Sequence, residues 1–536
     1  MAFEDKTLPP LEAELSSLLG AEGFDLDQAS RELMSQDIWA KGKTVSFVAR
    51  PASVEELQKT VTIAHKHGMA LAPRGGGMSY TKAYTPEREH TGSLDLSRLD
   101  QIVEINTDDM YVTVQAGVTW KTLYEALKPL GVRTPFWGPL SGIRSTIGGG
   151  VSQNNAFFGA GVYGTTGDSV LSVTVILANG TLIRTGSAGT KNGKPFWRHY
   201  GPDLTGLFCG DAGTLGYKAE VTFRLIPMPE AEDWASFEFT TQDGCARAMA
   251  AVGKTGLACE VFGFDPNLTK LRMKRASVLA DAKTLKNVVS GQGSLLKGLQ
   301  EGAKIALAGR DFLEADTWSL HLVVEDKTAE AVTTKMACLK TLCTEVGGQE
   351  TENSIPKIIR ANPFTPLNNI IGPSGERWVP LHGIVPVSHG EKVWGEIKTA
   401  FDKMRADFDK HKIDTGFLIT TLSTTGYLIE PVFLWPEELF PIHEQTVEKS
   451  YLKTINPYSA NAEATAMVAK ARAKVMEIFS RHQASHFQIG RTYPYRDHRE
   501  PETFALLKKI KRIVDPEGHI NPGALGLNEA PATIPV

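Results

Sequence analysis

The sequence predicts an α+β fold divided into two or three domains. Its 536 residues exceed what a single hydrophobic core usually serves. Short apolar strands alternate with amphipathic helices in the N-terminal part, and a second series of strands and helices begins after Pro227 and Pro229. We therefore expect one domain over residues 1–228, a second over residues 229–455, and a C-terminal segment over residues 456–536.

The N-terminal part is predicted element by element. A short strand precedes Ser53, which is a candidate helix N-cap because Glu56 lies three positions further on. An amphipathic helix and a strand ending before residue 73 follow. Further strands are expected within residues 92–117, then a helix over residues 119–131. Two strands within residues 170–185 flank Asn179-Gly180, a dipeptide typical of hairpin turns.

The middle part is expected to form one antiparallel sheet backed by helices. The predicted strands lie within residues 235–241, 317–326, 378–387 and 426–435, and the predicted helices within residues 327–347 and 390–411. A lysine-rich amphipathic helix beginning at Glu502 is expected to stop at Asp515-Pro516, and a turn follows it.

Composition excludes several classes of protein. The formal net charge of −4 gives no basic surface for binding phosphates, which argues against a nucleic-acid partner. The five cysteines include no Cys-x-x-Cys pair, which argues against a disulfide framework and a thiolate zinc site. The acidic start does not resemble a signal peptide, and no apolar run reaches about eighteen residues. We expect a soluble, cytoplasmic protein without a membrane span.

Two glycine-rich stretches are candidate phosphate-binding loops. Residues 73–80, "PRGGGMSY", directly follow a predicted strand, and residues 145–164 contain a second glycine run with Asn154 and Asn155. Consecutive glycines can turn successive N–H groups toward an anion, and Ser79 could add a hydroxyl donor. Two such loops suit a cofactor longer than one phosphate. The alternative is that each loop is only a tight turn.

Other nucleotide motifs do not fit. The G-x-G-x-x-G at residues 159–164 leads into a predicted strand, whereas a Rossmann fingerprint follows a strand and opens a helix. The Gly-Lys pairs at residues 42–43 and 193–194 also lack the spacing or the following residue of a Walker motif.

Seven segments, in order along the chain, resemble the FAD-linked oxidoreductases that include vanillyl-alcohol oxidase, p-cresol methylhydroxylase (the PCMH-type FAD-binding proteins) and the D-lactate dehydrogenases. The resemblance covers mainly residues 45–230 and 480–525. The segments that carry it are residues 48–80, 94–99, 112–131, 145–164, 173–186, 210–229 and 510–523.

The resemblance implies a two-part FAD-binding domain, built from the N-terminal half and the C-terminal tail, with an inserted cap domain of antiparallel sheet covered by helices. It implies that the FAD pyrophosphate is lined by Pro73, Arg74, Gly75, Gly76, Gly77, Met78 and Ser79. It places along the flavin Pro139, Ser145, Thr146, Gly148, Gly149, Asn154, Gly159, Gly161 and Tyr163. It places near the adenosine end, or in the tail that completes the domain, Gly213, Gly216, Tyr217 and Asn521.

Three positions of this chain bear on flavin attachment and on metal binding. Met78 stands where some relatives carry a flavin-linking histidine, so a covalent bond is excluded there and we expect non-covalent FAD. His382 lies in a segment similar to a cap strand that carries such a residue, and its alternative is an ordinary strand histidine. Residues 415–431 replace the metal-binding histidine motif of the hydroxy-acid branch and contain no histidine, so no metal is expected.

His486, in "SHFQIG", matches the active-site histidine segment of the hydroxy-acid branch, with Ser485 in place of a glutamate. An imidazole could accept the substrate hydroxyl proton while hydride leaves for flavin N5. The alternative is a histidine that closes a polar network between the domains. Arg491 and Tyr493 could pair with a carboxylate or a phenolate, or belong to a surface turn around Pro494. Asp168 is expected to bind loop N–H groups.

The resemblance implies an FAD-dependent oxidase or dehydrogenase acting on CH–OH or activated CH groups, with an aromatic or phenolic alcohol as the expected small-molecule substrate. A metal-free 2-hydroxy-acid dehydrogenase is the first alternative, and a non-catalytic flavin- or NTP-binding module is the second. The electron acceptor is expected to be O2 or a redox partner, and a homodimer would be common for this family.

Overall fold

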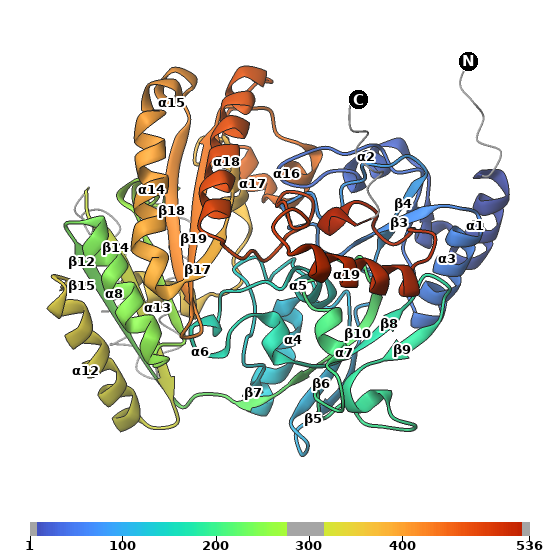
Figure 1. Cartoon of the computed structure of the whole chain (residues 1–536), viewed down its shortest axis with the longest axis horizontal. Coiled ribbons are helices and arrows are strands. Elements are labelled where there is room, and N and C mark those ends of the chain that lie inside the picture. Colours follow the sequence, from blue (N-terminus) through green and yellow to red (C-terminus); the bar gives the residue numbers. More distant parts are fainter. Residues whose placement is uncertain (1–7, 276–315, 528–536) are drawn as a thin grey trace. The chain divides into compact units, whose positions relative to one another are not determined.

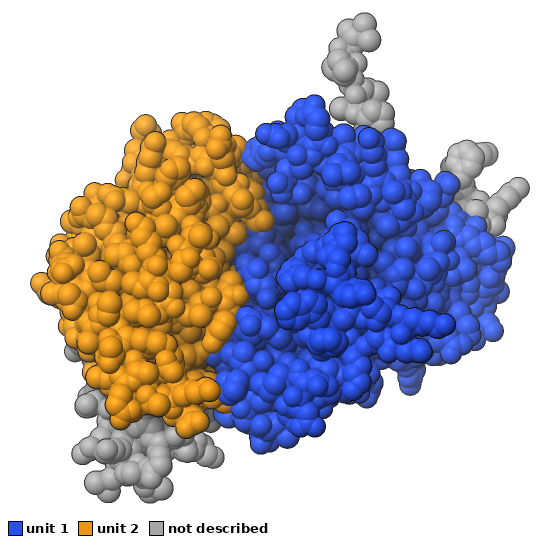
Figure 2. All heavy atoms as spheres, turned by 60° about the horizontal axis from the view of Figure 1, so that its bottom comes forward, with its two compact units in different colours: residues 1–155, 165–227, 487–536 blue, residues 156–164, 228–486 orange. Residues whose placement is uncertain are grey.

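The chain folds into two compact units. The computed structural model describes residues 8–275 and 316–527. Unit 1 comprises Met1–Asn155, Thr165–Pro227 and Phe487–Val536, and unit 2 comprises Ala156–Gly164 and Met228–His486 (Figure 2). The predicted combination of a two-part domain with an inserted one is confirmed. Residues 276–315 of the predicted cap lie outside the described residues.

The first sheet of unit 1 has four strands in the order β1-β2-β4-β3, of which Figure 1 labels β3 and β4. The pairs β2–β4 and β3–β4 are parallel, whereas β1–β2 is antiparallel. The strands and the helices of this region are β1 (Phe24–Asp25), β2 (Val48–Ala49), β3 (Ala70–Arg74), β4 (Thr91–Asp95), α1 (Leu8–Gly23), α2 (Gln28–Met34) and α3 (Val54–Lys66).

Helix α3 begins where the sequence predicts. The Ser53 side chain accepts a hydrogen bond of 3.1 Å from the N–H of Glu56. The Glu56 carboxylate accepts from the N–H of Ala52, one residue before the expected position. Leu57 and Val61 of this helix are fully buried in a core shared with Leu71 of β3. The helix therefore supports the strand that leads into the first glycine loop.

The second sheet of unit 1 is antiparallel, with the strand order β5-β6-β10-β8-β9. The predicted hairpin is confirmed, because β8 and β9 pair directly and Gly180 in their loop has a φ of 79°. The elements of this region are β5 (Ile102–Asn106), β6 (Tyr111–Gln115), α4 (Trp120–Leu127), β7 (Val132–Arg133), α5 (Ile147–Gln153), β8 (Val170–Ile176), β9 (Leu182–Arg184), α7 (Leu204–Leu207), β10 (Tyr217–Arg224), β11 (Ile226–Pro227) and α19 (Pro501–Val514).

The described residues of unit 2 form an eight-stranded sheet, in which each of the strand pairs is antiparallel, as predicted. The order is β15-β12-β14-β13-β18-β19-β16, and β17 also pairs with β19. Its strands are β12 (Ala231–Phe239), β13 (Glu260–Phe264), β14 (Trp318–Asp326), β15 (Gln349–Thr351), β16 (Arg377–Pro380), β17 (Gly383–Pro386), β18 (Asp414–Leu422) and β19 (Gly426–Trp435).

Helices cover this sheet in a row whose neighbours pack in the order α12, α8, α14 and α18 (Figure 1). The predicted helix over residues 390–411 is two helices, which meet at Met404. The helices in the described part of unit 2 are α6 (Ala160–Tyr163), α8 (Gln242–Thr255), α9 (Pro266–Arg275), α12 (Ala329–Glu345), α13 (Ser354–Ala361), α14 (Gly390–Lys403), α15 (Arg405–His411), α16 (Pro441–Thr446), α17 (Lys449–Leu452) and α18 (Ala462–Arg481).

The boundaries of the units differ from the predicted ones at two places. The return of the chain to unit 1 occurs after His486 and not after residue 455, because α18 packs on α14, α15 and β19 of unit 2. Residues 156–164 belong to unit 2 although they lie within the predicted N-terminal domain. In the described part of the chain, no helix combines the length and hydropathy that spanning a bilayer requires.

Candidate functional site

The two glycine-rich stretches meet within unit 1. The loop after β3 packs so closely on residues 144–146 that side chains would not fit. A Cβ on Gly75 would lie 2.1 Å from Thr146 Oγ1, and one on Gly76 would lie 2.0 Å from the carbonyl oxygen of Arg144. The Arg144 Nε donates a hydrogen bond of 2.9 Å to the carbonyl of Gly76. The glycines are therefore needed for close approach of backbone to backbone.

The first glycine loop has hydrogen-bond donors that an anion could use. Within residues 8–275 and 316–527, no hydrogen bond is recorded from the backbone N–H groups of residues 75–79. Gly77 and Ser79 of this loop are buried, and Gly77 has a φ of 72°. Buried N–H groups in native proteins are nearly always paired, so these donors fit a bound phosphate or diphosphate.

Two arginines approach this loop. The Arg74 guanidinium is buried, donates to the carbonyl of Gln36 at 2.8 Å and stacks over the Tyr84 ring at 4.4 Å. Burial and the neighbouring Arg74 lower the pKa of Arg144. A bound diphosphate would relieve the repulsion between these charges. The sequence did not predict a role for Arg144. Its position directly before the second glycine-rich stretch is the feature that could have indicated one.

The second glycine-rich stretch forms the start of α5. Thr146 is the N-cap of this helix, and its side chain accepts from the N–H of Gly149. A Cβ on Gly148 would lie 2.7 Å from the Cβ of Ala116, so this glycine lets the helix pack on the strand β6 region. Asn154 ends the helix with a φ of 52° and accepts from the N–H of Gly167 at 2.8 Å.

The remaining polar groups of this stretch stabilise its loops. Ser145 Oγ lies 2.6 Å from Ser141 Oγ, and the carbonyl of Pro139 accepts from the N–H of Gly142. Asp168 accepts from the N–H of Thr165 at 2.8 Å, which confirms its expected structural role.

The segment predicted for the adenosine end contacts the first loop from another side. A Cβ on Gly213 would lie 2.8 Å from the Cγ of Pro73, and one on Gly216 would lie 2.2 Å from a methyl of Val175. Tyr217 is fully buried, and its hydroxyl lies 3.1 Å from Nε2 of His65. These residues bring the 211–217 loop beside the strand that ends at Arg74.

The buried His65 is expected to lower the free energy of unfolding at acid pH. Burial lowers its pKa to about 4, while its Nδ1 lies 2.7 Å from the carbonyl of Ala178. Unfolded histidine has a pKa of about 6.5, so the unfolded chain binds the proton first as the pH falls. Above about pH 6.5 the contribution of His65 to the free energy of unfolding should be complete. As the pH falls toward about 4, the free energy of unfolding should decrease by at most about 3 kcal/mol for this reason.

Urea unfolding at neutral pH and at a pH between about 4 and 6.5 measures this effect as a shift of the unfolding midpoint. A His65→Gln variant should show a smaller decrease between the two pH values than the unsubstituted protein. An equal decrease in both proteins would show that other groups carry the acid sensitivity.

The C-terminal tail is tied to the first loop by Arg491 and Asn521. Arg491 donates through its Nη atoms to the carbonyls of Lys82, Ala83 and Pro522 and to Asn521 Oδ1, at 2.6–2.9 Å. Asn521 in turn donates to the carbonyls of Ala83 and Ala212. These contacts give Arg491 a structural role. Its expected contact with substrate stays a prediction. Tyr493, two residues after Arg491, is buried, with 4% of its surface exposed.

The glycines of residues 159–164 have structural partners within unit 2. The N–H of Gly159 donates to Glu260 Oε1 at 2.8 Å, and the N–H of Gly161 donates to the carbonyl of Cys259 at 2.9 Å. Tyr163 ends the four-residue helix α6. This short helix confirms that the motif is not a Rossmann fingerprint. Any contact of these residues with a flavin stays a prediction.

His382 and His486 lie together in unit 2. The carbonyl of Ile384 accepts from the N–H of Ser485 and the N–H of Ile384 donates back, both at 2.8 Å. This pairing sets His486 Nδ1 2.8 Å from the carbonyl of His382. The His486 ring also meets the Phe479 ring edge-on, with centroids 5.8 Å apart. Burial and His486 hold the pKa of His382 well below its ordinary value.

A comparison with protein families decides which cofactor these loops suit. Residues 45–186 match a family described as "FAD binding domain", and this range contains both glycine loops. Residues 45–186 form an FAD binding domain. The match confirms FAD as the cofactor, in agreement with the unpaired loop donors.

Relatives of the FAD binding domain include proteins of the resembled group. The glycolate oxidase subunit GlcD of Bacillus subtilis is 31% identical over 45% of this chain and 49% of its own length. A mitochondrial D-lactate dehydrogenase (cytochrome) of Saccharomyces cerevisiae is 30% identical over 41% of this chain and 37% of its own length. The chain thus spans about half or less of the curated relatives it matches.

Solved structures share the fold of the described residues. A p-cresol methylhydroxylase structure with bound substrate has a TM-score of 0.73, with 16% identity, and covers 98% of each chain. An alkyldihydroxyacetonephosphate synthase structure has a TM-score of 0.68, with 17% identity, over 96% of this chain and 84% of its own. At this level of identity the likeness shows the fold alone, and the predicted fold class is confirmed. The resemblance to the FAD-linked group is supported by the FAD binding domain match and its relatives.

Proposed function

We propose that this protein is an FAD-dependent oxidoreductase that takes hydride from a carbon bearing a hydroxyl group, and that its substrate is an aromatic or phenolic alcohol. The observation that carries the proposal is the FAD binding domain match together with the unpaired N–H groups of its first glycine loop. FAD, when bound, supplies the acceptor for the hydride.

His486 is the proposed general base. A carbonyl can only accept, so the contact with the carbonyl of His382 places the proton of the neutral ring on Nδ1. The lone pair is then on Nε2, which can take the proton from a substrate hydroxyl. Packing against Phe479 holds the ring in this orientation. The backbone pairing of Ser485 with Ile384 fixes the segment that carries it.

The substrate preference rests on the arginines. Arg491 directs its Nη groups to four acceptors of the chain, and Arg496 Nε pairs with Asp497 at 2.9 Å. These contacts reduce the support for a substrate carboxylate bound by either arginine. Tyr493 remains a candidate to hydrogen-bond a phenolic oxygen, and a Tyr493→Phe variant tests that role.

A 2-hydroxy-acid substrate is the second candidate. The names of the glycolate oxidase and D-lactate dehydrogenase relatives favour it, although the similarity covers less than half of this chain. The histidine-free segment 415–431, which forms most of β18 and β19, argues for a reaction without a metal.

Anaerobic reduction of the holoprotein distinguishes these candidates. We expect aromatic or phenolic alcohols to bleach the flavin faster than D-lactate or glycolate. Faster bleaching by the hydroxy acids would select the second candidate. Flavin that none of the substrates reduces would indicate a non-catalytic flavin protein. Reoxidation in air, compared with reoxidation by an artificial acceptor, then tests whether O2 or a redox partner accepts the electrons.

We predict that the FAD is released by acid. Met78 offers no nitrogen or oxygen for a flavin bond, and His382 is fully buried in unit 2. After acid precipitation the yellow colour should therefore appear in the supernatant. Colour that stays in the pellet would contradict this prediction, and a His382→Ala variant would then show whether His382 carries the bond.

Two proposals concern the context of the protein in the cell. The cytoplasmic location is predicted from the composition and the N-terminal sequence. The homodimer is predicted from the family resemblance. Fractionation and light scattering test them independently of the reaction.

A further inference from the structure

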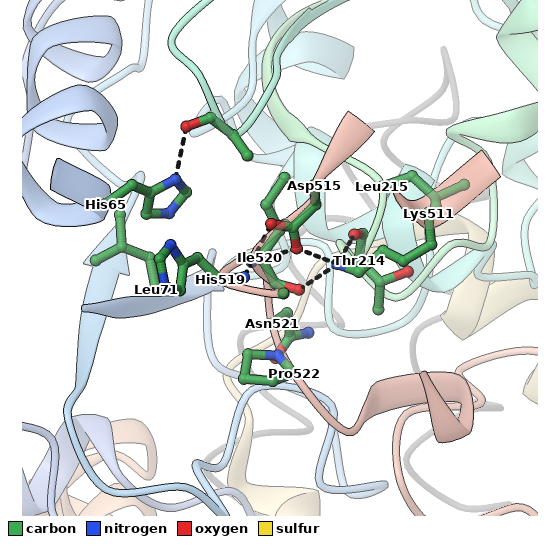
Figure 3. A network of polar contacts seen from close by, with 12 residues as sticks. His65, Leu71, Thr214, Leu215, Lys511, Asp515, His519, Ile520, Asn521 and Pro522 are labelled. Carbon is green, nitrogen blue, oxygen red and sulfur yellow. Dashed lines mark hydrogen bonds and ion pairs between the residues drawn. The ribbon is translucent and has the colours of Figure 1, made fainter. Parts of the chain in front are cut away.

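One lysine of the C-terminal helix α19 is buried inside unit 1. Lys511 Nζ donates to Asp515 Oδ2 at 2.6 Å, to the carbonyl of Thr214 at 2.6 Å and to the carbonyl of Ile520 at 2.8 Å (Figure 3). Its side chain is 1% exposed. An ammonium group has three N–H donors, so these three acceptors satisfy it completely.

Asp515 completes the same network. Besides Lys511, its carboxylate accepts from the N–H of His519 at 2.9 Å and from the N–H of Ile520 at 2.8 Å. These bonds shape the turn after α19. The pKa of Asp515 lies below its ordinary value, because Lys511 and these N–H groups outweigh the effect of burial. Lys511 and Asp515 thus form a buried ion pair in which both charged groups also make hydrogen bonds to the backbone.

The turn formed by this network lies against β3. The N–H of Leu71 donates to the carbonyl of His519 at 2.9 Å, and the N–H of Asn521 donates to the carbonyl of Leu71 at 3.0 Å. The tail therefore runs beside the strand as a short parallel partner (Figure 3). Three residues after Leu71, the strand ends at Arg74 and the first glycine loop begins.

The third acceptor of Lys511 is in the 211–217 loop. Thr214 follows Gly213, which packs directly against Pro73 at the end of β3. A second buried pair, Lys218 Nζ with Asp211 Oδ1 at 2.6 Å, fixes the base of the same loop. Lys511 thus joins the tail turn to the 211–217 loop, and both contact β3 next to the FAD-binding glycines.

We propose that Lys511 is a positioning residue for FAD binding. Its ammonium holds the tail turn and the 211–217 loop against β3, and this support keeps the donors of the first glycine loop in place. Lys511 itself makes no contact with the cofactor in this account. The inference rests on the FAD binding described above and adds a residue far from the glycine motifs.

The test compares Lys511→Met with Lys509→Met in the full chain. Lys509 lies on the exposed face of the same helix, so its variant controls for the loss of a positive charge. FAD is removed, and the dissociation constant is measured by quenching of flavin fluorescence as the apoprotein is titrated. We expect Lys511→Met to weaken FAD binding by at least about tenfold and Lys509→Met to leave it unchanged.

A double variant separates positioning from general stability. In Lys511→Met/Asp515→Asn no carboxylate is left buried without its partner, so the unfolding temperature should recover part of the loss seen in the single variant. FAD affinity should not recover, because the contacts with Thr214 and Ile520 are still missing. This variant also serves as the test if the single variant does not fold.

Two results would overturn the proposal. One is a folded Lys511→Met protein with unchanged FAD affinity. The other is a double variant in which FAD affinity recovers together with stability, which would show that Lys511 acts only on the folded state as a whole. If the unsubstituted protein itself binds no FAD, the failure lies in the proposed function and not in this inference.

Discussion

Replacing His486 with glutamine is expected to slow reduction of the bound FAD by substrate about 10²- to 10⁴-fold, the range typical of removing a general base. Glutamine retains a polar group but cannot accept the hydroxyl proton as imidazole does. The structure ties His486 to the carbonyl of His382, so the lost function should be proton transfer. Stopped-flow measurement of flavin bleaching under anaerobic conditions gives the rate directly.

The matched control is His482→Gln. His482 lies four residues before His486, and its ring pairs with the carboxylate of Glu396. We expect this variant to reduce flavin at the unsubstituted rate. FAD content should be the same in both variants. An unchanged rate in His486→Gln would remove His486 from the mechanism and leave the closing of a polar network as its role.

Replacing Gly76 with alanine is expected to weaken FAD binding at least about tenfold. The added Cβ would lie 2.0 Å from the backbone oxygen of Arg144, so one of the two glycine loops must move. Overpacking of a filled site typically costs about 1–3 kcal/mol. A loss of about 1.4 kcal/mol corresponds to a tenfold change in affinity. Titration of the apoprotein with FAD measures the effect.

Gly395→Ala is the control for this substitution. Gly395 lies in α14, and the nearest atom to its added Cβ is Gln242 Nε2 at 3.7 Å, an ordinary contact. This variant should bind FAD normally, and its helix should be slightly more stable. FAD affinity that is equal in Gly76→Ala and Gly395→Ala would show that the first glycine loop does not hold the cofactor.

Local patterns in the sequence predicted much of the fold. Ser53 and the dipeptide Asn179-Gly180 act over a few residues. Ser53 caps α3 and Asn179-Gly180 lies in the β8–β9 hairpin loop, both as predicted. The three glycines of residues 75–77 also predict a loop without side chains from the local sequence alone. Such features depend on backbone conformation and nearby hydrogen bonds, which the sequence displays directly.

The contacts that support the site depend on partners far apart in the chain. Lys511 belongs to a predicted amphipathic, lysine-rich helix, yet it is buried because Thr214 supplies an acceptor about 300 positions earlier. Arg491 is a predicted substrate-binding residue, and the sequence did not show that it also donates to carbonyls of residues 82–83 and 522. The burial of a charge is stable only when such partners assemble, and no local pattern reveals them.

The absorbance spectrum of the purified protein, before and after incubation with FAD and removal of unbound cofactor, shows whether this chain holds a redox-active flavin. We predict flavin bands that remain with the protein at about one FAD per chain and that bleach on anaerobic addition of an aromatic alcohol or a hydroxy acid. A colourless protein that retains no FAD after reconstitution would contradict the assignment of residues 45–186 and everything inferred from it.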